Sequence, residues 1–307
     1  MVFVCLLAIT TTPVLPAKPG TRATPITYSL TKEFNIGEDL HWANALALSG
    51  NGRTLASVRG SSKSIDLWDT QTGARLDQIP LGNEMVNDIA CSSNADYIAG
   101  QSYGLRPSSS GPQTNRIIVW SVKSKRVIFK HDFKHQIGGF TFGPSDATIV
   151  VTTCIPAQPG DVYALRSDVY VYDLVSSKLV RHSFSMDVGY ETPSIDETGR
   201  LIIATTTSVD ILDQRLRHVR TVSLPDDCIG QEAAYLGSGL LLIRIVDTSK
   251  PDYIDRVIIC DTSNNRKSYP LPDLTEANSV SVAASCRLFA ASFARGRVKI
   301  WQYSLCM

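Results

Sequence analysis

The chain lacks the sequence features that would assign it an activity directly. It has seven cysteines in 307 residues, but no Cys-x-x-Cys pair occurs, which argues against a zinc site or a thioredoxin-like motif. Their odd number and wide spacing argue against a disulfide framework, so we interpret them as small buried residues. No nucleophile elbow, P-loop or dinucleotide-binding glycine pattern is present. We therefore expect no catalytic residue, no metal and no cofactor.

Net charge is also nearly absent. The 30 Lys and Arg residues balance 29 Asp and Glu residues, which leaves a formal charge of +1. A balanced chain has no strong field to draw it to nucleic acid or to an anionic membrane. The 43% hydrophobic and 19% charged fractions are typical of a globular protein. We expect a globular protein with no nucleic-acid partner.

Long apolar runs are scarce. The run at residues 2–9 is too short and too interrupted for a membrane span. It is compatible with a signal peptide cut after Ala17, although no Lys or Arg precedes it. The cytoplasm is the favoured location, and export follows if residues 1–17 are a signal peptide. We assign residues 1–22 to a leader or disordered segment and residues 23–307 to a single domain.

What the chain does contain is a repeated strand pattern. Residues 62–79, SKSIDLWDTQTGARLDQI, form an alternating apolar strand that ends in Leu67-Trp68-Asp69, then a tight polar turn and a second strand. Five further strands end in a similar way, at spacings of 40 to 52 residues. The positions equivalent to Trp68 are Trp120, Tyr172, Leu212, Cys260 and Trp301. A basic period of about 40–45 residues with insertions is typical of β-propeller blades.

Each of these six units contains four predicted strands, A to D in chain order. In the first unit they are residues 45–52, 54–60, 65–69 and 74–81. Gly, Asn and Ser recur in the A–B and C–D turns and accept the backbone conformations of tight hairpins. No long segment has apolar residues at helical spacing. We predict an all-β fold, a β-propeller of six four-stranded blades, or seven if the chain is a fragment of a larger ring.

The last blade needs a strand from the other end of the chain. The sixth unit has no strand D, while residues 27–36 form an extra strand before strand A of the first unit. We expect this N-terminal strand to complete the last blade and close the ring. Closure protects sheet edges that an open ring would expose.

These features resemble the WD40-repeat family. The resemblance rests on the strand ends LWD, VWS, VYD, ILD, ICD and IWQ, on the period, and on turn phrases such as LSGNGRTLAS (48–57) and SIDETGRLII (194–203), and it covers about residues 25–304. The Gly-His pair that opens a typical repeat is missing, and the Asp of the tight B–C turn is not evident. We therefore expect the family's His–Asp–Ser–Trp hydrogen-bond network to be absent. The resemblance implies a divergent WD40-like propeller, a rigid scaffold for protein or peptide binding, usually without catalysis.

Three B–C connections are longer than a strand connection requires. They span residues 103–116, 156–168 and 246–256 and fall on one face of the ring, which we call the long-loop face. Each holds a Tyr and holds or borders an Arg, and these residue types commonly anchor interfaces. We predict that a protein or peptide partner binds through Tyr103, Arg106, Tyr163, Arg166, Tyr253 and Arg256. The alternative, that the loops are tolerated insertions without a binding role, stays open.

Two clusters are weaker candidates. His131 and His135 flank Asp132, but positions four apart on a strand are about 13 Å apart, too far for one metal ion. Residues 226–228, Asp-Asp-Cys, lie in a connection on the long-loop face, and we interpret them as a solvated turn.

Alternatives to a non-catalytic scaffold also stay open. A propeller enzyme, a hydrolase or lyase, would assemble acids and His at the mouth of the channel, and fold alone does not decide function. The chain can also be the propeller part of a larger multidomain protein. We expect a monomer or a subunit of a larger complex. Trp68, Trp120 and Trp301 are expected in the core between blades.

Overall fold

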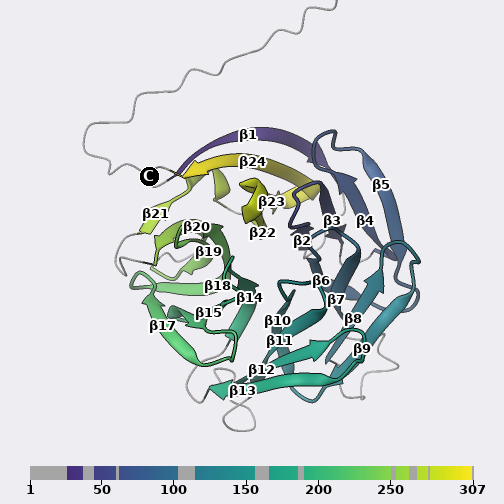
Figure 1. The fold of residues 1–307 in the computed structure, drawn as a ribbon. Helices are drawn as coiled ribbons and strands as arrows, with labels where there is room; N and C mark the ends of the chain where they lie inside the picture. The colour runs from purple at the N-terminus through teal and green to yellow at the C-terminus, as the bar shows by residue number, and fades with distance from the viewer. Residues whose placement is uncertain are drawn as a thin grey trace, which may run out of the picture.

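The computed structural model describes residues 26–36, 45–59, 62–102, 115–155, 166–185, 190–249, 254–262, 268–275 and 277–305. These residues form mostly β-strands, arranged as sheets around a central axis (Figure 1). Among them, no helix has the length and apolar character needed to cross a membrane. The boundary predicted at residue 22 lies outside the described residues.

The sheets follow one another in chain order. The first contains β2 (Ala45–Leu48), β3 (Thr54–Val58), β4 (Ser64–Asp69) and β5 (Arg75–Pro80). The second contains β6 (Val86–Cys91), β7 (Tyr97–Ser102), β8 (Asn115–Ser121) and β9 (Val127–Phe133). The third contains β10 (Gln136–Phe142), β11 (Thr148–Ile155), β12 (Arg166–Asp173) and β13 (Leu179–Ser185).

The fourth sheet is larger. It contains β14 (Tyr190–Ile195), β15 (Leu201–Thr205), β16 (Ser208–Leu212), β17 (His218–Ser223), β18 (Cys228–Gly237), β19 (Leu240–Asp247), β20 (Ile254–Asp261) and β21 (Ser268–Pro270). The last sheet contains β22 (Ser279–Ala283), β23 (Leu288–Phe293), β24 (Arg297–Leu305) and β1 (Ile26–Asn35). Short 3-10 helices occupy Pro272–Leu274 (η1), Ala284–Cys286 (η2) and Ala294–Gly296 (η3).

The all-β, propeller-like arrangement is confirmed, but the sheets are not six separate units. Within the described residues there are four sheets of four strands and one sheet of eight. The eight-stranded sheet joins the fourth and fifth units through one parallel bridge, between Thr192 of β14 and Glu232 of β18. Every other strand pairing in it is antiparallel. The number of sheets therefore does not by itself give the number of blades.

The N-terminal strand completes the last sheet, as predicted. β1 pairs antiparallel with β24, from Ile26 opposite Leu305 to Asn35 opposite Arg297. The Tyr28 hydroxyl also donates a hydrogen bond of 3.2 Å to Asp273, beside the fifth unit's outer strand β21. Segments from the two ends of the described chain thus share one sheet.

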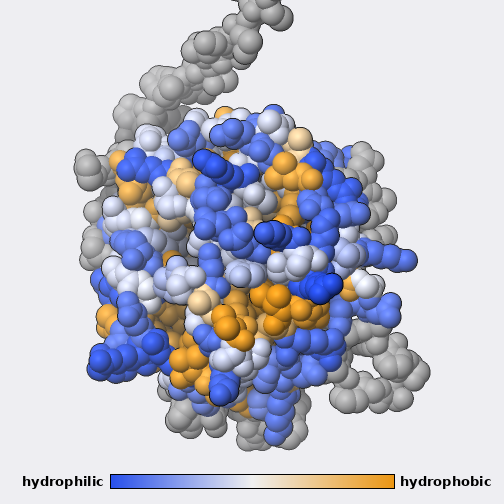
Figure 2. Space-filling model, turned by 45° about the vertical axis from the view of Figure 1, so that its right-hand side comes forward, coloured by the Kyte–Doolittle hydropathy of each residue, from blue (hydrophilic) through white to orange (hydrophobic). Residues whose placement is uncertain are grey.

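Burial is highest in the middle strands of each unit and lowest in the outer strands at the rim. All five residues of β15 are buried, whereas β17, at the rim of the same unit, buries only Val222. Neighbouring units cover both faces of the middle strands, so these strands read as continuous apolar runs. The outer strands have open faces, and Figure 2 shows a mostly hydrophilic outer surface with a gathered area of hydrophobic residues.

Turns of neighbouring units are tied to one another on the face opposite the long loops, which we call the turn face. The Ser285 hydroxyl of the sixth unit donates to the Gly50 carbonyl of the first. Asn51 N donates to the Ser93 carbonyl of the second unit at 2.8 Å. Ser93 N in turn donates to the Asp146 carboxylate of the third unit at 2.9 Å. These hydrogen bonds fix the relative positions of four consecutive units around the ring.

The tryptophans lie where the sequence predicted, with one difference in their hydrogen bonding. Trp120 and Trp301 are each 2% exposed, and Trp68 is half-buried against the Phe34 ring. The Trp68 indole donates to the Ser57 hydroxyl at 2.9 Å. The expected absence of the His–Asp–Ser–Trp network is therefore wrong for its Ser–Trp bond only, because a Ser on strand B and a Trp on strand C form this bond without the Gly-His pair.

Candidate functional site

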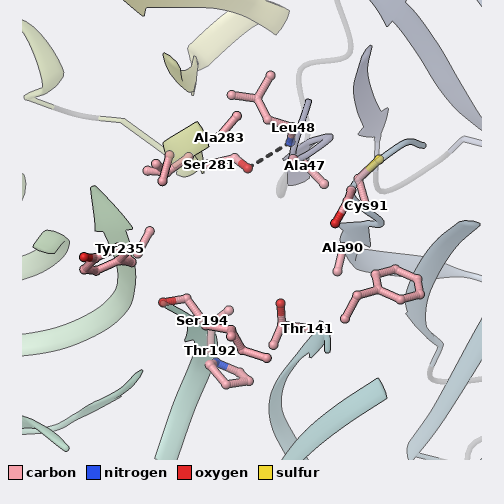
Figure 3. Close-up of a pocket in the computed structure, with 18 of the residues that line it drawn as sticks. Ala47, Leu48, Ala90, Cys91, Thr141, Thr192, Ser194, Tyr235, Ser281 and Ala283 are labelled. Atoms are coloured by element: carbon pink, nitrogen blue, oxygen red, sulfur yellow. Dashed lines mark hydrogen bonds between the residues drawn. The ribbon is translucent and has the colours of Figure 1, made fainter. Parts of the chain in front are cut away.

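The innermost strand of each unit lines a cavity on the axis of the ring. Strands β2, β6, β10, β14, β18 and β22 contribute to it, and Figure 3 shows their side chains arranged around an open centre. The cavity has a volume of about 600 Å³. Strand A of each unit begins at the long-loop face and ends at the turn face, so the cavity forms a channel between the two faces.

The ionisable side chains along this channel are mostly carboxylates. The lining consists largely of small, apolar and hydroxyl side chains such as Ala47, Thr141 and Ser281. Its Asp and Glu residues are Asp88, Asp146, Asp196, Glu197 and Glu232. None of the described lining residues is Lys, Arg or His. The channel therefore favours cationic over anionic groups.

Asp88 and Glu232 are the two carboxylates nearest the long-loop end. Asp88 Oδ1 accepts a hydrogen bond of 2.8 Å from Ile89 N. Burial and, to a smaller extent, the charge of Glu232 raise the pKa of Asp88, the Ile89 hydrogen bond and the charge of Arg244 oppose the shift, and the net value is about 7. A carboxyl group with such a pKa exchanges a proton near neutral pH.

Glu232 has structural partners that Asp88 lacks. Its Oε2 accepts hydrogen bonds from Arg244 Nε at 3.3 Å and from Val280 N at 3.2 Å. Val280 belongs to β22, so Glu232 links the fifth and sixth units. Arg244 also donates to Asp255 at 3.2 Å. Glu232 is thus held between a neighbouring guanidinium and the backbone of the next unit.

The carboxylates at the turn-face end serve the turns themselves. Asp196 accepts hydrogen bonds from Thr198 N and Arg200 N, and it pairs with Arg200 Nε at 2.6 Å. Burial alone would raise the pKa of Asp196, but these bonds outweigh it and lower the pKa. Asp146 is bonded to Ser93 through both carboxylate oxygens. These two residues are explained by turn structure.

The first long loop starts and ends at an ion-pair network. Glu84 accepts hydrogen bonds from Ser102 Oγ at 2.6 Å, from Lys130 Nζ at 2.9 Å and from Arg116 Nη1 at 3.3 Å. Ser102 ends β7 and Arg116 lies in β8, on either side of the loop. Arg116 also forms a bidentate pair with Asp132, at 2.5 and 3.0 Å. The network therefore fixes both ends of the loop to the connection between β5 and β6, which contains Glu84.

The bases of the other two long loops also contain a buried acid. At the second loop, Asp168 accepts a hydrogen bond of 2.9 Å from the Tyr170 hydroxyl, and His182 stacks on the Tyr170 ring at 4.6 Å. At the third loop, Asp247 pairs with Arg256 Nη2 at 3.0 Å. All three loops of the long-loop face therefore begin from strand ends that polar contacts hold in place.

Most of the predicted partner-binding residues fall outside the described part of the chain. These are Tyr103, Arg106, Tyr163 and Tyr253. Arg166 begins β12, and only its backbone is described. Arg256 is described and is engaged by Asp247. The predicted interface thus stays a prediction. Sequence reasoning missed Asp88 and Glu232, whose only signal was a carboxylate inside a predicted strand A.

The weaker candidates do not form a metal site. His131 Nε2 lies 3.0 Å from the Tyr172 hydroxyl, beside the Phe129 and Phe133 rings, and burial lowers its pKa. Burial raises the pKa of the Cys228 thiol, which the charge of Asp247 raises further. Across the described ranges, no group of three or more His, Cys, Asp or Glu side chains is placed to hold a metal ion.

Comparison with known proteins gives a likeness at the level of fold. No family model matches the sequence, and no curated protein matches it. Among solved structures, the chain is similar to the β-propeller domain of Cps50 (Swd1) from Myceliophteria thermophila, with a TM-score of 0.61 and 11% sequence identity. The match covers 90% of this chain and 99% of that chain. At this identity the likeness shows the fold alone, and that fold is a β-propeller.

Proposed function

We propose that this chain is a non-catalytic, WD40-like β-propeller scaffold that binds a protein or peptide partner through its long-loop face. The observation that carries the proposal is the polar anchoring of all three long loops at their bases. Loops on a rigid scaffold are where binding residues concentrate. Anchored loop ends also reduce the conformational entropy that a loop loses when it binds.

The ring is best counted as six blades. Each half of the eight-stranded sheet, β14–β17 and β18–β21, repeats the four-stranded antiparallel order of the other sheets. A single bridge, between Thr192 and Glu232, joins the two halves. Two blades whose inner strands touch at one point account for this arrangement. The proposed scaffold comprises residues 23–307, preceded by a leader or disordered segment at 1–22, and acts as a monomer or as a subunit of a larger complex.

The proposed contact residues are the Tyr and Arg side chains of the long loops. Tyr103, Tyr163 and Tyr253 supply apolar area with a polar tip, and Arg106 and Arg166 supply hydrogen-bond donors. Arg256 has a different role, because its pairing with Asp247 fixes the end of the third loop. The nearly neutral net charge gives no reason to invoke nucleic acid as the partner.

The test compares the full chain with two variants. In one, the three long loops are replaced by short Gly-Ser turns, and in the other Tyr103, Tyr163 and Arg166 are changed to Ala. Both are checked for folding by circular dichroism. A partner that the wild-type chain captures and that both folded variants lose supports the proposal. A partner that binds the variants with full affinity refutes it.

One observation favours a second candidate, an enzyme of the hydrolase or lyase class. Asp88, with a pKa raised to about 7, and the arginine-paired Glu232 line the same channel. Two carboxyl groups in different protonation states are the requirement for general acid and general base catalysis.

A substrate panel separates this candidate from the scaffold. Nitrophenyl glycosides and esters are incubated with the full chain, with Asp88→Asn and with the control Asp96→Asn, whose carboxyl is exposed. Turnover that Asp88→Asn abolishes and Asp96→Asn retains supports an enzyme. Turnover equal in all three proteins, or none above buffer, leaves the channel carboxylates without a catalytic role.

A further inference from the structure

The long-loop end of the axial channel contains more carboxyl groups than cations. Asp88 and Glu232 line this end. The guanidinium of Arg244 is shared between Glu232 and Asp255, so three carboxyl groups face one cation. Asp88 accepts a hydrogen bond from Ile89 N through Oδ1, and its other carboxylate oxygen has no hydrogen-bond partner among the described residues. A cationic ligand in the channel would balance the charge of this set.

A hydroxyl group without a partner lies at the same end of the channel. Ser279 lines the channel and is 9% exposed, and its hydroxyl forms no hydrogen bond with a described residue. The next residue, Val280, donates its backbone N–H to Glu232, which places Ser279 beside that carboxyl group. Ser281 lies on the same face of β22, and its hydroxyl accepts a hydrogen bond from Leu48 N. Buried polar groups in native proteins are nearly always hydrogen-bonded, so Ser279 indicates a polar ligand in the channel.

The walls between the two ends of the channel suit an aliphatic chain. Figure 3 shows the small side chains of Ala47, Ala90 and Ala283 around the open centre. At the turn-face end, the lining carboxyl groups include Asp146, which is bonded to an uncharged serine, and the exposed Glu197. Acids therefore lie at both ends of a channel whose volume, about 600 Å³, is typical of small-molecule sites.

We propose that the channel binds a linear aliphatic diamine or polyamine, with one primary ammonium group between Asp88, Glu232 and Ser279. The ammonium N–H groups donate hydrogen bonds to the carboxylate oxygens and to the serine hydroxyl. The methylene chain packs along the alanines, and a second ammonium group lies toward Asp146 and Glu197. The lysine side chain of a partner protein fits less well, because its single cation leaves the acids at the turn-face end unbalanced. This site uses none of the long-loop residues and goes beyond the proposed scaffold function.

Isothermal titration calorimetry of the full chain with 1,4-diaminobutane and with spermidine tests the proposal. The reference ligands are 1-aminobutane, which has one ammonium group, glutarate, which has the opposite charge, and N-acetyl-lysine methylamide, which represents a lysine of a partner. The variants are Asp88→Asn and Ser279→Ala, and circular dichroism checks that both are folded. The control is Asp96→Asn, the same chemical change at an exposed position.

The proposal expects saturable binding of the diamine or the polyamine. The affinity should fall about tenfold or more in Asp88→Asn, should fall less in Ser279→Ala, and should stay unchanged in Asp96→Asn. Because burial raises the pKa of Asp88 to about 7, the ionised fraction of this group falls about tenfold from pH 8 to pH 6, and the affinity should fall with it. The alkyl ammonium groups stay charged over this range.

Three results overturn the proposal: no saturable binding, an affinity that Asp88→Asn leaves unchanged, or tighter binding of glutarate. Equal or tighter binding of 1-aminobutane or of the lysine derivative also overturns it, because the channel then selects a single ammonium group. The variant with three long-loop side chains changed to Ala should bind the amine as the wild type does. A failure of this proposal is therefore distinguishable from a failure of partner binding at the long-loop face.

Discussion

Replacement of Asp88 by Asn should make the stability of this protein less dependent on pH. Burial and the charge of Glu232 raise the pKa of Asp88 from 3.8 to about 7 in the folded chain. The folded state therefore binds this proton more tightly than the unfolded state. Between the two pKa values, stability falls as pH rises, because the unfolded chain ionises the group freely while the folded chain resists ionisation.

The structure sets the size of this effect. One pH unit of pKa difference corresponds to 1.36 kcal/mol, so ionised Asp88 destabilises the fold by roughly 4 kcal/mol above pH 7. At pH 5.5 the destabilisation has built up only over the interval from pH 3.8 to pH 5.5, and it amounts to about 2 kcal/mol. Asn has no proton to exchange. The stability gain of Asp88→Asn should therefore widen by about 2 kcal/mol between pH 5.5 and pH 8.

Urea denaturation followed by tryptophan fluorescence at these two pH values measures the widening. The matched control is Asp96→Asn, the same chemical change at an exposed position, which should follow the wild-type pH profile. The widening does not depend on how well an amide packs beside Glu232, because that contribution is the same at both pH values. If the difference in unfolding free energy between Asp88→Asn and the wild type stays constant or narrows as pH rises, the reasoning is refuted.

Three further predictions concern packing and hydrogen bonding. Gly139→Ala should cost about 1–3 kcal/mol of unfolding free energy, because the added Cβ lies 2.4 Å from Thr192 Cα and one of two inner strands must move; an unchanged urea midpoint would contradict this. Trp301→Ala should cost roughly 3–5 kcal/mol, since the indole is 2% exposed and stacks on Phe289 at 5.1 Å; calorimetry measures it, and a cost near zero would place Trp301 outside the core. Ser57→Ala should cost about 1 kcal/mol through its bond to Trp68 and shift the Trp68 fluorescence; an unshifted spectrum would count against that bond.

Local sequence patterns determined the strands and their order. Strands A to D of the first unit, predicted at 45–52, 54–60, 65–69 and 74–81, correspond to β2, β3, β4 and β5. Alternating apolar residues and turn residues act within a few positions along the chain, so they can be read without the fold. The N-terminal strand was predictable in the same way, because the repeat left one strand position unfilled.

The channel depended on tertiary structure. Asp88 and Glu232 lie in units that are far apart in the chain, and only ring closure brings their charges close enough to shift a pKa. The bridge between Thr192 and Glu232 has the same origin, and no strand pattern indicates that the inner strands of two units will touch.

The turn face shows the same division. The sequence identifies the C–D turns at 123–125 and 175–177 from their polar residues. It does not show that Val175 and Ile128 line one groove between the second and third units, because this is set by the rotation from one unit to the next. The sequence by itself therefore determined the repeating unit and the closing strand, since both follow from short-range periodicity. The tertiary structure decided which charges face the channel and which apolar side chains meet between units, since both depend on the geometry of the closed ring.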